Sequence, residues 1–298
     1  MAAAAFWALK ALTMSMLNDW GSFPLIDLFH GTGVAYEYRK RGSPAHAPLQ
    51  RVFAIVLTAL GGTMLTGFLL GQPPSWLCYS EVIPAYCFCW FVMERLPQEP
   101  LFRLIEGSAL AEFAMMVLDD VSWGIAITSW GQDKATSAQH EPARASAVAA
   151  LLCGVVSGCG GGVIQRAFGL LGEPWAFTTP PDFRRVSFAV KLSTFCSVFY
   201  YVLTDPHRYL LGALGAVGAG TAYTASGLPV QDRDTARFLV VCVVVLCSSM
   251  RTHGVALVLG SGSGSGSGDG NDNTKANEGV PAAASRGRSR SRASKKRQ

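Results

Sequence analysis

The stretch that decides the fold is GCGGGVIQ, residues 158–165, which lies inside an apolar run from residue 148 to residue 171. A glycine in a helix interior costs about 1 kcal/mol relative to alanine, so four glycines in this stretch require a physical reason. A phosphate-binding loop needs a preceding strand and a following Lys-Ser/Thr pair, and the sequence offers neither. A glycine-interrupted membrane helix is therefore the better interpretation.

The composition is typical of a polytopic membrane protein. Half of its 298 residues are hydrophobic and 15% are charged, whereas soluble domains carry about 25% charged residues. A helix satisfies its own backbone hydrogen bonds inside lipid and needs about 20 mostly apolar residues to cross. We therefore predict an all-α polytopic membrane protein.

Seven apolar stretches are candidates for crossing the membrane. An eighth stretch, 209–228, is rich in glycine and alanine, and we treat it as re-entrant or peripheral. The seven predicted spans are residues 23–38, 52–70, 82–96, 101–130, 148–171, 186–204 and 236–259.

The basic residues predict the orientation. The odd-numbered connections are rich in them, with Arg39, Lys40 and Arg41 in the first and Arg184 and Arg185 in the fifth. Such connections stay in the cytosol. Residues 1–22 are then a luminal N-terminal segment, residues 23–259 form the transmembrane domain, and residues 260–298 form a cytosolic tail.

The tail accounts for the net charge. It holds eight of the Lys/Arg residues and three of the Asp/Glu residues, and so carries the entire formal charge of +5. We interpret it as a disordered basic tail near anionic lipid rather than a nucleic-acid binder. Lys295 and Lys296 match a dilysine retrieval signal, which predicts residence in the membrane of the endoplasmic reticulum or nuclear envelope.

The glycines fall at corresponding places if the spans form two triplets. Gly61 and Gly62 lie in the middle of the second span, and Gly160, Gly161 and Gly162 lie in the middle of the fifth. Glycine-interrupted helices at corresponding positions indicate a binding site at the bilayer midplane. Close helix packing through small residues is the alternative explanation.

Carboxylates mark the fourth span. In one continuous helix, Glu112 and Asp119 would nearly superimpose, and Glu106 and Asp120 would flank them on the same broad face. This pattern favours cation passage, but it equally fits a polar stripe buried against neighbouring helices.

Four motifs in order resemble the trimeric intracellular cation (TRIC) channels. FPLIDL resembles their first helix and GGTMLTGFLLGQP their glycine-kinked second helix. GGGVIQRAFGLLGEPW resembles their fifth helix, and SFAVKLSTF resembles the start of their sixth. These motifs occupy residues 23–28, 61–73, 160–175 and 187–195.

The resemblance implies a seven-helix protomer, built from two inverted three-helix repeats and a seventh helix, that assembles as a homotrimer. Each protomer has a pore bounded by the glycine-kinked second and fifth helices. It also implies conduction of monovalent cations, chiefly potassium ions, as counter-current during calcium release. The membrane lipids are the remaining partners, and no cofactor is expected.

Site residues follow from the same resemblance. The glycines at 61, 62 and 160–162 would bend the pore helices. Asp27 would hold a cation near the pore or pair with Lys191. Ser187 and Lys191 would lie at the pore constriction, although Lys191 equally fits a side chain that extends to the cytosolic interface.

The sequence departs from the family in the fourth helix. The family has a basic Lys-Glu-Val motif there that binds phosphoinositide, whereas this chain has the acidic LDDVSWG at 118–124. We therefore do not expect inositol-lipid binding at this place. Cys159 also stands where the family has a lysine before the fifth-helix glycines.

Two rival functions remain. A small-solute carrier built from two triple-helix repeats would show the same helix count and glycine breaks. A membrane-embedded enzyme is disfavoured, because the five histidines are scattered and the sequence contains no His-Glu-x-x-His zinc motif.

Overall fold

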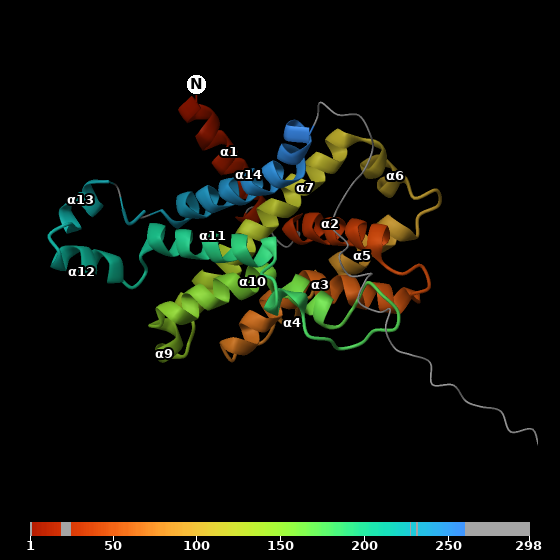
Figure 1. Ribbon diagram of the computed structural model, residues 1–298, viewed down its shortest axis with the longest axis horizontal. Coiled ribbons are helices and arrows are strands. Elements are labelled where there is room, and N and C mark those ends of the chain that lie inside the picture. The colour runs from red at the N-terminus through yellow and green to blue at the C-terminus, as the bar shows by residue number, and fades with distance from the viewer. Residues whose placement is uncertain (1, 19–24, 227, 231, 260–298) are drawn as a thin grey trace, which may run out of the picture. The chain divides into compact units, whose positions relative to one another are not determined.

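The computed structural model describes residues 2–18, 25–226, 228–230 and 232–259, and these residues form helices without strands (Figure 1). The predicted all-α class is confirmed. Part of the predicted first span, the tail and its Lys295 and Lys296 lie outside the described residues. The helices are α1 Ala2–Asn18, α2 Leu25–Arg41, α3 Pro48–Leu69, α4 Ser75–Cys78, α5 Val82–Glu94, α6 Pro100–Gly107, α7 Ala109–Ile125, the π-helix η1 Ala126–Asp133, α8 Lys134–Thr136, α9 Glu141–Arg144, α10 Ala147–Ala167, the 3₁₀-helix η2 Pro181–Phe183, α11 Phe188–Thr204, α12 Tyr209–Ala216, α13 Gly220–Ala225 and α14 Arg233–Leu259.

Three helices are long and apolar enough to cross a membrane in the part of the chain that the structure describes. They are α3, α10 and the first 20 residues of α14, and they match the predicted second, fifth and seventh spans. The apolar helices α5 and α11 have 13 and 17 residues and fall short of that length. The arrangement as two inverted repeats plus a seventh helix stays a prediction.

The predicted span 101–130 is wrong as a single helix. The backbone at Ser108 is extended, which separates α6 from α7. The cause is local, because Gly107 weakens the helix and the Ser108 hydroxyl accepts a hydrogen bond from the Ala111 amide at 3.3 Å, as an N-cap does. Glu106 therefore belongs to α6 and does not share a helix face with Glu112 and Asp119.

Helices α3 and α10 pack closely against each other. Around them, α2 packs on α5 and α7, and α10 also packs on η1 and α11. One buried cluster joins α2, α3 and α5 through Tyr36, Ile55 and Tyr86. A second joins α11 and α14 through Tyr200 and Val240. The α3–α10 contact thus joins two separately packed groups of helices.

The N-terminal segment forms a helix that the sequence analysis did not anticipate. Four alanines precede Phe6, and alanine is the strongest helix former. The ring of Phe6 lies 5.1 Å from the ring of Phe238 on α14, edge to face. Lys10 pairs with Asp232 just before that helix. Helix α1 is therefore fixed to the beginning of α14.

The glycine- and alanine-rich stretch 209–228 forms the two short helices α12 and α13, with eight and six residues. Neither is long enough to cross a membrane, and neither contains a buried residue. This agrees with the predicted peripheral or re-entrant placement.

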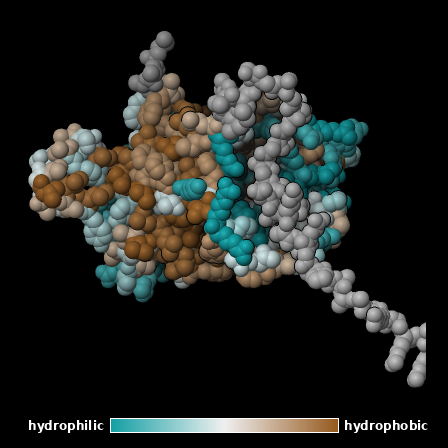
Figure 2. Space-filling view, in the orientation of Figure 1, coloured by the Kyte–Doolittle hydropathy of each residue, from teal (hydrophilic) through white to brown (hydrophobic). Residues whose placement is uncertain are grey.

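Large apolar side chains are exposed along the long helices. Leu110, Val148 and Leu246 are each more than 60% exposed, and Figure 2 shows hydrophobic residues gathered over the region of α10 and α11. Scattered single exposures are ordinary, but a broad apolar surface indicates contact with protein or lipid. On a bundle with apolar helices of spanning length, such a surface fits contact with lipid or with further copies of the chain.

Candidate ion pathway

Glycines bring α3 and α10 into backbone contact. A methyl group on Gly61 would lie 3.2 Å from the Gly161 Cα, and one on Gly160 would lie 2.9 Å from the Gly62 Cα. A methyl group on Gly161 would overlap the carbonyl oxygen of Thr58. These four glycines therefore allow close packing, which was the alternative explanation. Both helices are unbroken, and the predicted kinks stay a prediction.

Gly162 differs from the other four glycines. The atoms nearest to a methyl group added there belong to the Arg166 guanidinium, at 3.3 Å, and not to α3. Its lack of a side chain leaves room for that guanidinium near the end of α10.

Asp27 lies in a polar cluster on α2. Its carboxylate accepts a hydrogen bond from the hydroxyl of the buried Tyr86 on α5, at 3.2 Å. One turn further along α2, the His30 Nδ1 lies 2.7 Å from the Asp119 carboxylate on α7. The rings of His30 and Tyr86 also meet edge to face at 6.3 Å. The cluster thus holds two carboxylates and a histidine between three helices.

This cluster reaches the glycine contact. The His30 Nε2 lies 3.3 Å from the carbonyl oxygen of Ala59 on α3, two residues before Gly61. Carboxylate and carbonyl oxygens are the groups that replace water around a permeating cation. Glu112 and Asp119 both face α2, as their seven-residue spacing predicts, whereas Asp120 turns to Ser248 on α14. The predicted common face is therefore wrong for Asp120.

A second polar cluster adjoins the end of α10. Arg166 donates two hydrogen bonds to the Asp182 carboxylate, at 2.7 and 2.9 Å. Ser187 interacts with the same carboxylate, and its hydroxyl caps α11 by accepting from the Val190 amide at 3.4 Å. The structure thus connects the predicted residues Ser187 and Gly162 through Arg166.

Lys191 lies one turn into α11 and is exposed. Among the described side chains it makes no ion pair with Asp27, whose partner is Tyr86. The predicted Asp27–Lys191 pair is therefore not formed. Lys191 remains a candidate for the pathway entrance or for the membrane interface.

Sequence reasoning missed three of these residues. His30 looks like one more scattered histidine, but it follows Asp27 by three residues, and residues i and i+3 share a helix face. Tyr86 gave no signal among the apolar residues of its span. Asp182 gave none either, since 14 residues separate it from the end of α10.

Asp182 should make the folded protein less stable in acid. Burial opposes ionisation, but the hydrogen bonds from Arg166 and Ser187 outweigh it and hold the pKa of Asp182 below its usual 3.8. A carboxyl group with a lowered folded pKa contributes stability that is present above the unfolded pKa and is lost as the pH falls through the folded pKa. We expect the free energy of unfolding to fall below about pH 4.

Chemical unfolding in detergent at a series of acidic pH values measures this dependence. Asp182→Asn should flatten the acid limb of the profile. Glu141→Gln, which removes an exposed carboxylate, is the control and should leave the limb unchanged. An Asp182→Asn profile that overlays the parent profile would contradict this assignment.

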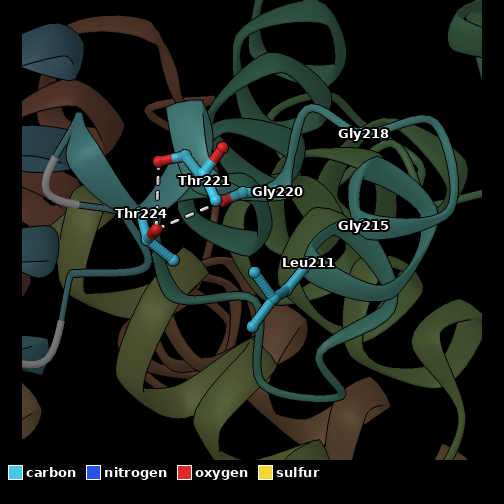
Figure 3. A pocket seen from close by; sticks show the side chains of 6 residues that line it. All are labelled: Leu211, Gly215, Gly218, Gly220, Thr221 and Thr224. Carbon is cyan, nitrogen blue, oxygen red and sulfur yellow. Dashed lines mark hydrogen bonds between the residues drawn. The ribbon is translucent and has the colours of Figure 1, made fainter.

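Two cavities lie outside the glycine contact. One of about 380 Å³ lies between α12 and α13 and is lined by Leu211, Thr221, Thr224 and three glycines. Figure 3 shows that the Thr224 hydroxyl is directed to the backbone of Gly220 and Thr221. With no charged residue in its lining, this cavity offers little to an ion. The other cavity, of about 450 Å³, borders η1 and α14.

Comparisons with solved structures identify the fold. A TRIC counter-ion channel described for its activity in calcium release matches with a TM-score of 0.62 and 20% identity, over 82% of this chain and 99% of that chain. A trimeric intracellular cation channel from C. elegans, solved without Ca²⁺, matches with a TM-score of 0.59 and 19% identity, over 85% of this chain and 97% of that chain. A TRIC cation channel whose structure concerns the basis of conductance matches with a TM-score of 0.51 and 16% identity, over 80% of this chain and 94% of that chain. No protein-family model and no curated protein sequence matches. Because the sequence identities are 20% or lower, these comparisons show that the folds are alike.

Proposed function

We propose that this chain, which has the fold of the trimeric intracellular cation channels, is a divergent member of that family and a potassium-permeable channel. One observation carries the proposal. Inside an apolar bundle, α3 and α10 meet through paired glycines, and a carboxylate cluster lies next to that contact. Polar side chains in a membrane bundle face cavities or partners and mark ion pathways.

The proposed pathway runs from the Asp27 cluster past the α3–α10 contact towards Ser187. The carboxylates of Asp27 and Asp119 supply negative charge to concentrate cations, and the Ala59 carbonyl supplies an uncharged ligand beside the glycines. Fixed carboxylates attract cations of any size, so they explain charge selection. The preference for potassium follows from the proposed family membership.

We further propose a homotrimer in the membrane of the endoplasmic reticulum or nuclear envelope, with the N-terminus in the lumen and the C-terminus in the cytosol. The proposed role is counter-ion current during calcium release. The fold shared with trimeric intracellular channels supports the assembly. The basic residues of the odd-numbered connections support the orientation, because connections rich in Lys and Arg stay in the cytosol.

The deciding experiment is the reversal potential of the purified protein in a planar bilayer under a potassium chloride gradient. We expect discrete current steps that reverse near the potassium equilibrium potential. In Lys191→Ala, the loss of one positive charge beside the pathway should raise the single-channel conductance by about twofold, which corresponds to removing one repulsion across several ångströms of water.

Arg103→Ala is the matched control, because it removes an exposed cation from another helix and should leave the conductance unchanged. Single-channel currents identical in Lys191→Ala and the parent protein would remove Lys191 from the pathway. Absence of current, together with solute uptake that saturates, would replace the channel by the small-solute carrier.

A further inference from the structure

The cavity of about 450 Å³ beside η1 and α14 is rich in cations. Lys134, Arg233 and Arg237 line it together with one carboxylate, Asp133. We call it the basic cavity. Its remaining lining residues are Tyr79, Ser129, Trp130 and Ser137. The candidate ion pathway uses none of these residues.

The single carboxylate is already occupied. Asp133 accepts hydrogen bonds from Arg233 at 3.1 Å, from Arg237 at 2.8 Å and from Tyr200 at 2.9 Å. Outside the cavity lining, Asp234 accepts a further bond from Arg237 at 2.6 Å. Across the described residues, Lys134 has no ion pair, so the lining keeps an excess of positive charge.

Hydrogen-bond donors also remain available. The Arg237 Nε is buried and has no acceptor among the described atoms, so Arg237 contributes positive charge to the cavity rather than an accessible donor. Arg233 donates through one terminal nitrogen and is half exposed. An arginine fork and a lysine ammonium together suit an anion with several oxygens, which the fork binds in a bidentate manner and the ammonium binds as a point charge.

We propose that the basic cavity binds a phosphate group, either free or on a lipid headgroup. A carboxylate ligand suits it less, because three cationic side chains line the cavity and a phosphate monoester carries more negative charge than a carboxylate. Trp130 and Tyr79 line the same cavity, and such aromatic rings sit at headgroup level in membrane proteins. By the proposed orientation the site faces the lumen. It is separate from the acidic segment 118–124, where the family resemblance would locate inositol-lipid binding.

Binding is measured on the full chain without any current, so this test is independent of the proposed channel function. Inorganic phosphate is titrated into the detergent-solubilised protein by calorimetry. In parallel, nanodiscs containing phosphatidic acid or phosphatidylcholine are compared by native mass spectrometry for lipid retained on the protein. We expect phosphate-bearing probes to bind and phosphatidylcholine, whose phosphate is masked by choline, to be retained less.

Lys134→Gln should weaken binding about tenfold, as the loss of one charge-assisted contact does. Arg103→Gln, an exposed cation outside the cavity, is the control and should bind as the parent does. Arg233→Gln replaces a half-exposed side chain. It is the second test variant if Lys134→Gln does not fold, and we expect the same loss of binding affinity.

Each outcome decides the proposal. Binding of inorganic phosphate that weakens in the variant supports a free-phosphate ligand. Retention of phosphatidic acid alone, weakened in the variant, supports a lipid headgroup. Absence of both, or affinities equal in the cavity variant and in Arg103→Gln, overturns the proposal.

Discussion

A Gly161→Ala variant should unfold at a temperature lower than the parent protein by on the order of 10 °C, which corresponds to a loss of about 3 kcal/mol. The added methyl group would overlap the carbonyl oxygen of Thr58 on α3. Because that atom belongs to the backbone, no rotamer change relieves the overlap, and α3 and α10 must separate. The better helix propensity of alanine offsets about 1 kcal/mol of the cost.

Gly212→Ala is the matched control for this prediction. Gly212 also lies inside a helix, α12, but a methyl group there would meet no atom within 4 Å. This variant should be as stable as the parent or more stable by up to about 1 kcal/mol. Thermal unfolding in detergent compares the two. If both variants unfold at the same temperature, the close approach of α3 and α10 does not contribute to stability as the structure indicates.

Asp133→Asn should destabilise the protein by about 3 kcal/mol, the cost of breaking a largely buried ion pair on one side. Asp133 and Arg237 are only 17% and 16% exposed, and Tyr200 and Arg233 also donate to this carboxylate. An asparagine offers one oxygen for three donors and leaves Arg237 with a single carboxylate. The contact between η1, α11 and α14 should weaken as a result.

Asp234→Asn is the control that removes one negative charge beside Arg237 without removing the buried Asp133 carboxylate. It removes the other carboxylate that contacts Arg237, but Asp234 is 41% exposed and lies three residues away on the same helix. Such a pair contributes about 0.5 kcal/mol or less. Denaturant unfolding of both variants in the same detergent measures the difference. If both variants lose the same free energy of unfolding, Asp133 does not stabilise the contact between η1, α11 and α14 more than an exposed ion pair does.

Much of the fold was readable from the sequence. The lengths of the apolar stretches predicted α3, α10 and α14, because crossing lipid requires about 20 apolar residues in one run. The resemblance in four short motifs predicted the fold that the structural comparisons then identified. The break before α7 was also readable from Gly107 and Ser108, although the apolar residues on either side concealed it.

The candidate site was only partly readable. Asp27 and the glycines were identified because a carboxylate and clustered glycines are costly inside a membrane helix. Their partners were not, since Tyr86, His30 and Ala59 reach them from positions set by packing. Lys191 was assigned by the resemblance, and the structure leaves it exposed.

The sequence by itself determined the all-helical class and the three long apolar helices α3, α10 and α14, because these properties depend on composition and on the length of apolar runs. Only the tertiary structure decided that the paired glycines bring two backbones together, that Asp119 faces α2 while Asp120 faces α14, and that Asp133 binds α14. The physical reason is that a side chain's partner depends on the rotation and depth of each helix. Those are fixed by contacts between residues far apart in the chain, such as Asp120 and Ser248, which are 128 positions apart.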